Sequence, residues 1–308
     1  MSPKSQRWIH TRGDLAADGW ESVVDERTPG WAHTGIRVAQ LMTGQSLALD
    51  TVGVERIVVP LTGSFSVTHS DGDTAATTKL SGRQSPFDGP TDVLYLSAAS
   101  TASLSGTGRV AVASSPTTNI YPTRYIAAAQ IPIELRGAGA SSRQVHNFGT
   151  PSTLDAARLI VCEVITPAGN WSSYPPHKHD QAVPGYETRL EEIYYFETAS
   201  ERGEPGDERA DPFGMFSAYS SPAGEIDINA MVRSGDIALV PHGYHGPAVA
   251  PPGYDLYYLN VMAGPGPERD WLISDDPCHA WIRRTWTGQD VDPRLPYATE
   301  LDDEGRHS

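Results

Sequence analysis

Residues 175–180 read Pro-Pro-His-Lys-His-Asp, so that two histidines, His177 and His179, stand two residues apart. Side chains alternate between the two faces of a β-strand, and on a strand this spacing places both imidazoles on the same face. Two neutral imidazoles are good ligands for zinc, iron, manganese or nickel. The stretch therefore predicts a metal site on β-structure, with Lys178 pointing away from the ligands and free to pair with Asp180.

Short segments with strand composition, each bounded by Gly, Pro, Ser or Asp, dominate the rest of the chain. Strands are expected at Gly35–Met42, Glu55–Val59, Ser64–His69, Asp92–Leu96 and Arg109–Ala113, and then at Arg158–Ile165, Ile193–Glu197, Asp236–Val240 and Asp255–Met262. Helical periodicity is scarce, and short helices are expected only near Asp14–Trp20 and after Trp271. The pattern indicates an all-β sandwich or barrel.

The two halves of the chain repeat one pattern. A strand that opens with Glu55 and a later strand that opens with Asp92 correspond to strands that open with Glu191 and Asp236. The first half has no histidine between Gly44 and Glu55 or in Ser97–Thr101, where the second half has its histidines. We therefore expect an N-terminal barrel without a metal site (1–130), a C-terminal barrel with one (131–270) and a C-terminal tail (271–308).

Two downstream motifs offer the remaining metal ligands. Residues 190–196 read Leu-Glu-Glu-Ile-Tyr-Tyr-Phe, which places the carboxylates of Glu191 and Glu192 at the start of an aromatic strand. Residues 235–245 read Gly-Asp-x4-Pro-His-Gly-Tyr-His and form a turn that carries His242 and His245. A third imidazole and a carboxylate would complete a site that keeps open positions for a substrate.

The order of these motifs resembles the two signature motifs of the cupin superfamily. Carried over residue by residue, the resemblance implies that His177, His179, Glu192 and His245 are the metal ligands. The segment between His179 and the glutamates is longer than in compact cupins, so Glu191 stays open as the alternative carboxylate. Glu192 is favoured because it directly precedes the hydrophobic strand.

Longer stretches, at residues 169–180, 190–195, 240–245 and 251–264, resemble the bacterial 5-deoxy-glucuronate isomerases of inositol catabolism. The resemblance implies an all-β chain with two cupin-type (jelly-roll, double-stranded β-helix) barrels. It also implies an aldose–ketose isomerase that converts 5-deoxy-D-glucuronate to 5-dehydro-2-deoxy-D-gluconate. A cupin Fe(II) dioxygenase and a ketol-isomerase that acts on another deoxy-uronate are the alternatives.

Such an isomerase needs a base that moves a proton between C2 and C1 of the sugar. Glu191, His242 and Tyr244 are the catalytic candidates, since they lie beside the ligand motifs. The substrate carboxylate calls for an arginine, because guanidinium pairs with carboxylate in a bidentate manner. The sequence alone does not choose among its candidates, which are Arg143, Arg158, Arg189, Arg269 and Arg283.

Composition limits the partners. The 308 residues include 23 Lys and Arg against 38 Asp and Glu, a formal charge of −15, which argues against nucleic acid and anionic membranes as partners. No apolar segment is long enough to span a membrane, and the first residues lack the apolar core of a secretory signal. We expect a cytoplasmic homo-oligomer (dimer or hexamer) with free thiols at Cys162 and Cys278. Its expected ligands are one divalent metal ion (zinc, with manganese, iron or nickel as alternatives) and a small anionic sugar acid.

Overall fold

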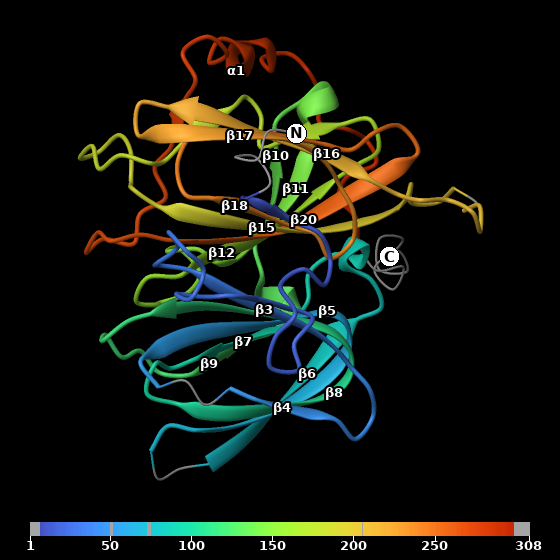
Figure 1. The fold of residues 1–308 in the computed structure, drawn as a ribbon. Coiled ribbons are helices and arrows are strands. Elements are labelled where there is room, and N and C mark those ends of the chain that lie inside the picture. Colours follow the sequence, from blue (N-terminus) through green and yellow to red (C-terminus); the bar gives the residue numbers. More distant parts are fainter. Residues whose placement is uncertain (1–6, 50–51, 73–74, 205, 299–308) are drawn as a thin grey trace.

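The computed structural model describes residues 7–49, 52–72, 75–204 and 206–298, and it forms two stacked halves (Figure 1). Nearly all regular structure in these residues is antiparallel β-sheet, which confirms the all-β prediction. The one α-helix that they contain, α1 (Ile282–Thr285), is a single turn. Three short 3-10 turns complete the elements, at Pro86–Asp88, Ala128–Gln130 and Gly139–Ser141.

The N-terminal half is one eight-stranded sheet with the order β2-β3-β8-β5-β7-β9, in which β4 pairs with β8 and β6 with β5. Its strands are β2 (Ser22–Val24), β3 (Gly35–Leu41), β4 (Ser46–Ala48), β5 (Val54–Ser70), β6 (Ala75–Arg83), β7 (Val93–Leu96), β8 (Thr101–Pro116) and β9 (Arg124–Ile126). The long strand β5 includes both segments that were expected as separate strands, because the chain continues through a register shift between Pro60 and Thr62.

The expected helix near Asp14–Trp20 is wrong. The segment consists of turns, since Gly13, Asp18 and Gly19 all have positive φ, a conformation that a right-handed helix excludes.

The C-terminal half consists of two sheets. A seven-stranded sheet has the order β1-β18-β15-β20-β12-β11-β10, and a smaller sheet has the order β17-β16-β19-β14-β21, with β13 paired to β19. The strands of the larger sheet are β1 (Ile9–His10), β10 (Ile133–Arg136), β11 (Arg143–Gly149), β12 (Ile160–Thr166), β15 (Glu191–Ser200), β18 (Ile237–Val240) and β20 (Tyr254–Ala263). The strands of the smaller sheet are β13 (Trp171–Ser172), β14 (His177–Lys178), β16 (Gly214–Ser221), β17 (Gly224–Val232), β19 (Tyr244–Val249) and β21 (Ser274–Asp275).

Both ends of the described chain cross the expected division at residues 130 and 270. Strand β1 lies in the first expected domain but pairs with β18 of the C-terminal sheet. Strand β21 belongs to the expected tail but pairs with β14, opposite His177. Further along, Tyr297 is buried, and its main chain exchanges two hydrogen bonds with the Gln144 side chain. The ends therefore help to build the C-terminal half.

The two halves share one hydrophobic core. Alternation along β5 sends Ile57 and Val59 into a core that also contains Val161 and Tyr195 of the C-terminal sheet. The opposite face of β5 contributes Val58 to a second core made within the N-terminal half. The absence of a metal site from this half stays a prediction.

Buried polar contacts also join the halves. Arg83 of β6 forms a two-pronged ion pair with Glu163 of β12, with nitrogen–oxygen distances of 2.7 and 2.6 Å. The Glu55 carboxylate accepts hydrogen bonds from the main-chain N–H groups of residues 157–159. Because buried charges are costly unless they are paired, these contacts fix how the halves dock.

The cysteines and the helices bear on two further expectations. Cys162 is buried and Cys278 exposed, and both are free thiols, as predicted. The described residues contain no helix with the length and apolar character needed to cross a membrane.

Candidate metal centre

The His-x-His stretch begins in the two-residue strand β14, with His179 directly after it, and strand pairing places His177 opposite another predicted ligand. His177 is the register partner of His245 in β19. The ring centroids of His177 and His245 are 4.6 Å apart, and those of His179 and His245 are also 4.6 Å apart. The neighbouring histidines His177 and His179 thus meet the distant His245 in one buried cluster.

The long segment between His179 and Glu192 closes on itself. The N–H of Leu190 donates to the carbonyl of His179 at 2.8 Å, so the segment leaves and rejoins the sheet at nearly the same place. The Lys178 ammonium holds the segment from outside the cluster, with Asp180 and Glu187 each 2.8 Å away. The extra residues therefore leave Glu192 beside His179, and the predicted Lys178–Asp180 pair is present.

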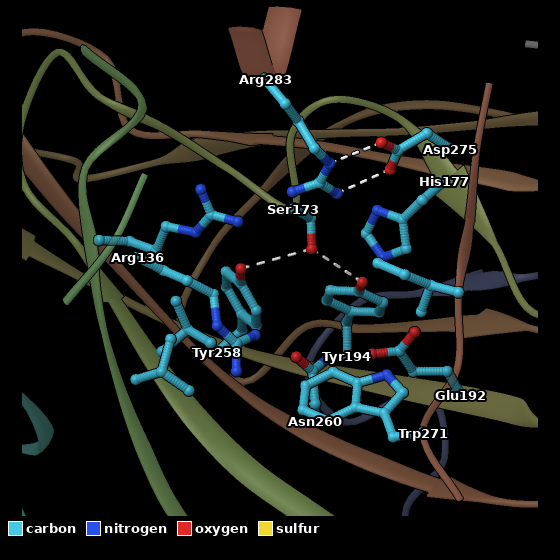
Figure 2. Close-up of a pocket in the computed structure, with 14 residues that line it drawn as sticks. Arg136, Ser173, His177, Glu192, Tyr194, Tyr258, Asn260, Trp271, Asp275 and Arg283 are labelled. Carbon is cyan, nitrogen blue, oxygen red and sulfur yellow. Dashed lines mark hydrogen bonds and ion pairs between the residues drawn. The ribbon is translucent and has the colours of Figure 1, made fainter. Parts of the chain in front are cut away.

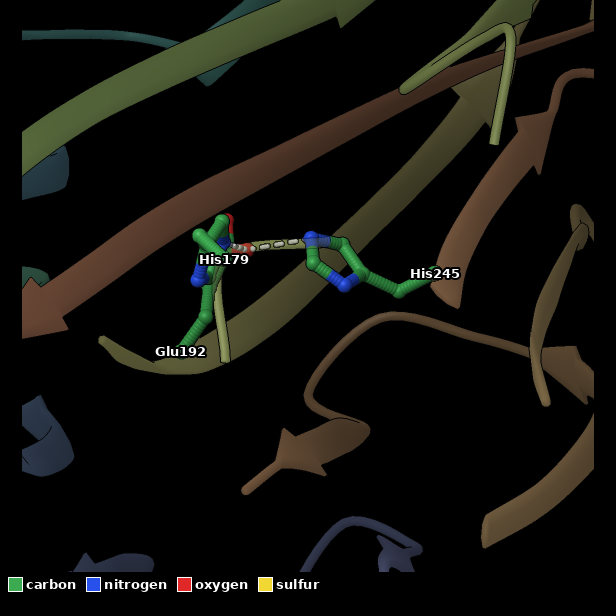
Figure 3. Close-up of side chains that lie close together, drawn as sticks. All are labelled: His179, Glu192 and His245. Atoms are coloured by element: carbon green, nitrogen blue, oxygen red, sulfur yellow. Dashed lines mark hydrogen bonds and ion pairs between the residues drawn. The ribbon is translucent and has the colours of Figure 1, made fainter. Parts of the chain in front are cut away.

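His179, Glu192 and His245 form the tightest group of candidate ligands (Figure 3). One ligand atom from each residue lies within 4.8 Å of the others. Nε2 of His179 is 2.9 Å and Nε2 of His245 is 3.0 Å from the same carboxylate oxygen of Glu192. His177 is not part of this group, although its ring borders that of His245. Its role as a fourth ligand stays a prediction.

The hydrogen bonding of the imidazoles suits a metal ion. Nδ1 of each ring lies near a main-chain carbonyl, that of Pro175 for His177, Leu190 for His179 and Gly243 for His245, at 3.1 to 3.2 Å. Such a contact on Nδ1 leaves Nε2 as the metal-binding atom. Nε2 of His245 is buried and lies 3.0 Å from a Glu192 oxygen, but the two atoms are not aligned for a hydrogen bond, which leaves Nε2 able to bind a further group.

The charge of the cluster also suits a cation. Burial disfavours the charged form of Glu192, but the contacts with His179 and His245 outweigh it and lower the pKa of this carboxyl to about 2. Burial and the two neighbouring imidazoles lower the pKa of His177 well below its usual value. Despite burial, the contact with Glu192 raises the pKa of His179, so this carboxylate favours a positive charge on its imidazole neighbour. A divalent ion can take the place of that proton, and a carboxylate with imidazoles is the donor set that zinc and similar ions take.

Strand alternation separates the two adjacent glutamates. Glu192 faces the histidines, whereas Glu191 faces the N-terminal half and accepts hydrogen bonds from the N–H groups of Ala32, His33 and Thr34 at 2.6 to 3.3 Å. The Thr34 hydroxyl donates a further one at 3.0 Å. This carboxylate is fully engaged away from the cluster, so its placement contradicts the catalytic role suggested for Glu191. Strand β15 has no bulge at this point that would turn Glu191 inward.

The placement of Glu191 makes its role testable. Glu191→Ala leaves the donors of residues 32–34 without their acceptor, and we expect the free energy of unfolding to fall by about 1–3 kcal/mol. Glu191→Gln keeps one acceptor oxygen and should recover part of that loss. Urea denaturation and activity of both variants test this. Wild-type stability of Glu191→Gln with activity reduced 100-fold or more would restore the catalytic assignment.

The other two catalytic candidates lie outside the cavity described below. His242 is partly exposed, with Nε2 3.2 Å from the carbonyl oxygen of Glu225. Tyr244 stacks on Tyr219 with a centroid distance of 5.5 Å. Neither residue lines the cavity, so the structure does not place them for proton transfer there.

A cavity of about 400 Å³ lies between the two C-terminal sheets, with His177 and Glu192 in its wall (Figure 2). The larger sheet lines it with side chains from several of its strands, and the C-terminal segment closes one side. The remaining lining residues are Arg136, Arg143, Val145, Val164, Ser173, Tyr194, Tyr258, Asn260, Trp271, Ile273, Asp275 and Arg283. The volume suits a small sugar acid.

Three hydroxyl groups line the cavity beside the cluster. The Ser173 hydroxyl lies 2.9 Å from the Tyr194 hydroxyl and 3.4 Å from the Tyr258 hydroxyl. Ser173 and Tyr194 are absent from the candidates drawn from the sequence, although alternation from Glu192 already places Tyr194 on the ligand face. Arg136, Trp271 and Asp275 carry no comparable signal, since they reach the cavity only through the tertiary fold.

The structure shows which of the candidate arginines line the cavity. Arg143 and Arg283 line the cavity, whereas Arg189 lies in a separate surface depression. Arg158 donates to the Gly264 carbonyl at 2.8 Å and Arg269 donates to main-chain carbonyls of residues 149, 154 and 159. Arg158 and Arg269 thus brace the main chain and do not face the cavity.

Comparison with known proteins identifies the family. A sequence model described as the KduI/IolB family matches residues 9–282. The chain belongs to the KduI/IolB family. It is 37% identical over 262 residues to a protein of Geobacillus thermodenitrificans named 5-deoxy-glucuronate isomerase, covering 84% of this chain and 89% of that relative. The Bacillus subtilis (strain 168) protein of the same name is 37% identical over 253 residues, covering 81% and 88%.

Solved structures agree with this membership of the KduI/IolB family. An IolB-like protein from Salmonella typhimurium LT2 superposes with a TM-score of 0.77 at 35% identity, covering 89% of this chain and 98% of that one. The oxalate decarboxylase of Lactobacillus farciminis, solved as a formate complex, gives a TM-score of 0.59 at 10% identity, covering 87% and 88%. The second likeness concerns the fold alone, and it identifies the cupin-type architecture that the motifs predicted.

Proposed function

We propose that the protein is a metal-dependent aldose–ketose isomerase that converts 5-deoxy-D-glucuronate to 5-dehydro-2-deoxy-D-gluconate. The observation that carries the proposal is the name shared by relatives that are 37–38% identical over most of the chain. The buried ligand cluster in the wall of a sugar-sized cavity supports the same chemistry.

The proposed metal is one divalent ion, zinc, held by His179, Glu192 and His245 with His177 as the fourth ligand. Such an ion would supply Lewis-acid stabilisation of the negative charge that develops on the sugar oxygens during enolisation. The protein contributes a preorganised donor set, because the main-chain carbonyls fix the orientation of each imidazole.

The reaction itself is a balanced proton transfer. A base removes the proton from C2, the carbonyl double bond shifts to give an enediol, and a proton is delivered to C1 while the O2 proton is transferred to O1. No oxidant or second substrate is needed. The cavity must therefore hold one group that accepts and returns a proton near the ligand cluster.

Asp275 is the group that we propose for this proton transfer. It is the cavity-lining carboxylate outside the ligand cluster, and it is the register partner of His177. Arg283 holds it in a two-pronged ion pair at 2.5 and 2.6 Å, which fixes its orientation (Figure 2). Asp275→Asn should lower kcat by about 10²–10⁴-fold with unchanged metal content. Full kcat in this variant would contradict the role of Asp275.

Turnover under anaerobic conditions tests the function as a whole. We expect the metal-loaded protein to convert 5-deoxy-D-glucuronate to its ketose without oxygen, followed by NMR of the sugar. Turnover that requires oxygen would instead support an Fe(II) dioxygenase. Preference for another deoxy-uronate would place the protein with the other ketol-isomerases.

A further inference from the structure

Three arginines line the cavity, and two of them have acidic partners. Arg136, at the end of β10, pairs with Glu134 at 2.8 Å through each of two nitrogens. Arg283 pairs with Asp275, as described above. The third arginine, Arg143, opens strand β11 and differs from both.

Arg143 is buried, yet none of the described acidic residues forms an ion pair with it. Its one hydrogen bond in this part of the chain runs from Nη1 to the Ser141 carbonyl at 3.0 Å. The guanidinium also lies over the Trp286 ring, with 5.6 Å between its central carbon and the ring centroid. Most of its five N–H donors therefore remain available toward the cavity.

The backbone makes room for this guanidinium. A Cβ at Gly137 would lie 2.7 Å from Nη1 of Arg143 and still closer to the Ser141 carbonyl oxygen. Gly137 also has φ near +78°, which side chains rarely adopt. The turn between β10 and β11 is thus shaped so that the Arg143 side chain can lie beneath it.

The charge arrangement favours an anion. Arg136 and Arg143 are direct partners in the antiparallel register, where like charges repel. Burial, together with Arg136 and Arg283 nearby, lowers the pKa of Arg143 to about 10. The chain carries 38 acidic residues, so a shortage of acidic side chains does not explain why the buried Arg143 has no carboxylate partner among the described residues.

We propose that Arg143 is the subsite that binds the carboxylate of a sugar-acid substrate, in the cavity whose wall also includes His177 and Glu192. This inference deepens the proposed function and rests on it for the identity of the substrate. A guanidinium fork matches a carboxylate in two parallel hydrogen bonds. Bound there, the substrate directs its carbonyl end toward His177 and Glu192, which line the same cavity.

The hydroxyl groups that line the cavity can bind the middle of such a substrate. Figure 2 shows the hydroxyls of Ser173, Tyr194 and Tyr258 between Arg136 on one side and His177 and Glu192 on the other. Hydroxyls in that position can bond to the hydroxyls along a sugar chain. Arg136 and Arg283 are already neutralised by Glu134 and Asp275, so Arg143 sets the preference for an anionic ligand.

The test uses two probes that differ in charge, D-glucuronate and its uncharged counterpart D-glucuronamide, with equilibrium binding measured on the metal-loaded protein. We expect the wild type to prefer glucuronate. Arg143→Met should weaken glucuronate binding by about 10- to 100-fold and change glucuronamide binding by less than about 3-fold. Arg143→Lys keeps the positive charge but not the two-pronged geometry of the guanidinium, so its affinity for glucuronate should lie between those of the wild type and Arg143→Met. This partial recovery would show that the loss in the methionine variant is not a folding defect.

Arg158→Met is the matched control, since Arg158 is a partly buried arginine outside the cavity, and it should leave both affinities unchanged. The assignment of Arg143 as the carboxylate subsite would be overturned if Arg143→Met still prefers glucuronate over glucuronamide. It would also be overturned if the wild type shows no such preference. If the wild type prefers glucuronate through Arg143 but does not isomerise 5-deoxy-D-glucuronate, the subsite stands and the proposed function fails. Conversely, normal isomerisation with unchanged KM in Arg143→Met would support the proposed function and overturn the subsite.

Discussion

Replacing His245 with alanine is expected to abolish metal binding and to reduce activity by at least about 10³-fold. The side chain contributes Nε2 at 3.0 Å from the Glu192 carboxylate and lies between the rings of His177 and His179. A Lewis acid that stabilises the transition state by several kcal/mol accounts for a loss of this size, because each 1.36 kcal/mol changes the rate about tenfold. Elemental analysis of the purified variant, together with its activity, measures both effects.

His242→Ala is the control, because His242 lies on the same turn but outside the cavity. It should retain one equivalent of metal per chain, as the wild type does. His177→Ala asks whether the fourth imidazole is required, and we expect loss of metal there as well. Full metal content in His245→Ala, or a second tightly bound equivalent in the wild type, would contradict the proposed site.

The second large effect concerns stability. Arg83→Met is expected to lower the free energy of unfolding by about 3–5 kcal/mol, because it removes the permanently charged partner of the buried Glu163 carboxylate and leaves it only His146, 2.6 Å away, as an ion-pair neighbour. The Arg83 and Glu163 side chains are almost inaccessible, at 2% and 0% exposed, and they join the two halves of the chain. Urea denaturation of the metal-loaded protein measures the loss. The double variant Arg83→Met with Glu163→Gln should recover part of it, since the neutral amide costs less to bury.

The same pair predicts a pH dependence. Burial opposes ionisation of Glu163, but Arg83 and His146 outweigh it and lower its pKa to about 2. A lowered carboxyl pKa stabilises the folded state above the pKa of an unfolded glutamate, about 4.3, and this contribution is lost as the pH falls toward 2. The difference between wild type and Arg83→Met should therefore shrink below about pH 4. A constant difference down to pH 3 would contradict this account.

The sequence predicted the ligand cluster better than the rest of the site, for a physical reason. Period-two alternation separates Glu192 from Glu191, and the structure places Glu192 beside His179 and His245, so local spacing carries this part of the information. The role of His177 as a ligand stays a prediction. Alternation places Glu191 on the face opposite Glu192, and its hydrogen bonds to residues 32–34 explain why a carboxylate is present there.

Closeness to the ligand motifs along the sequence does not predict which residues reach the cavity. His242 and Tyr244 lie next to His245 along the chain but do not line the cavity. The residues that complete it, such as Arg143 and Asp275, come from strands of two different sheets, which only the tertiary fold brings together. Nothing in their local sequence distinguishes them from surface charges.

The pairing of β14 has a consequence for how the protein is made. This two-residue strand carries His177, and both of its partners, β19 and β21, follow it in the chain. Synthesis proceeds from the N-terminus, so the N-terminal half can begin to fold while β14 still lacks both neighbours. The second neighbour of β14 is available only once Ser274 and Asp275 have left the ribosome, so we expect the strand that carries His177 to be fixed late, after the last proposed ligand, His245, has been made.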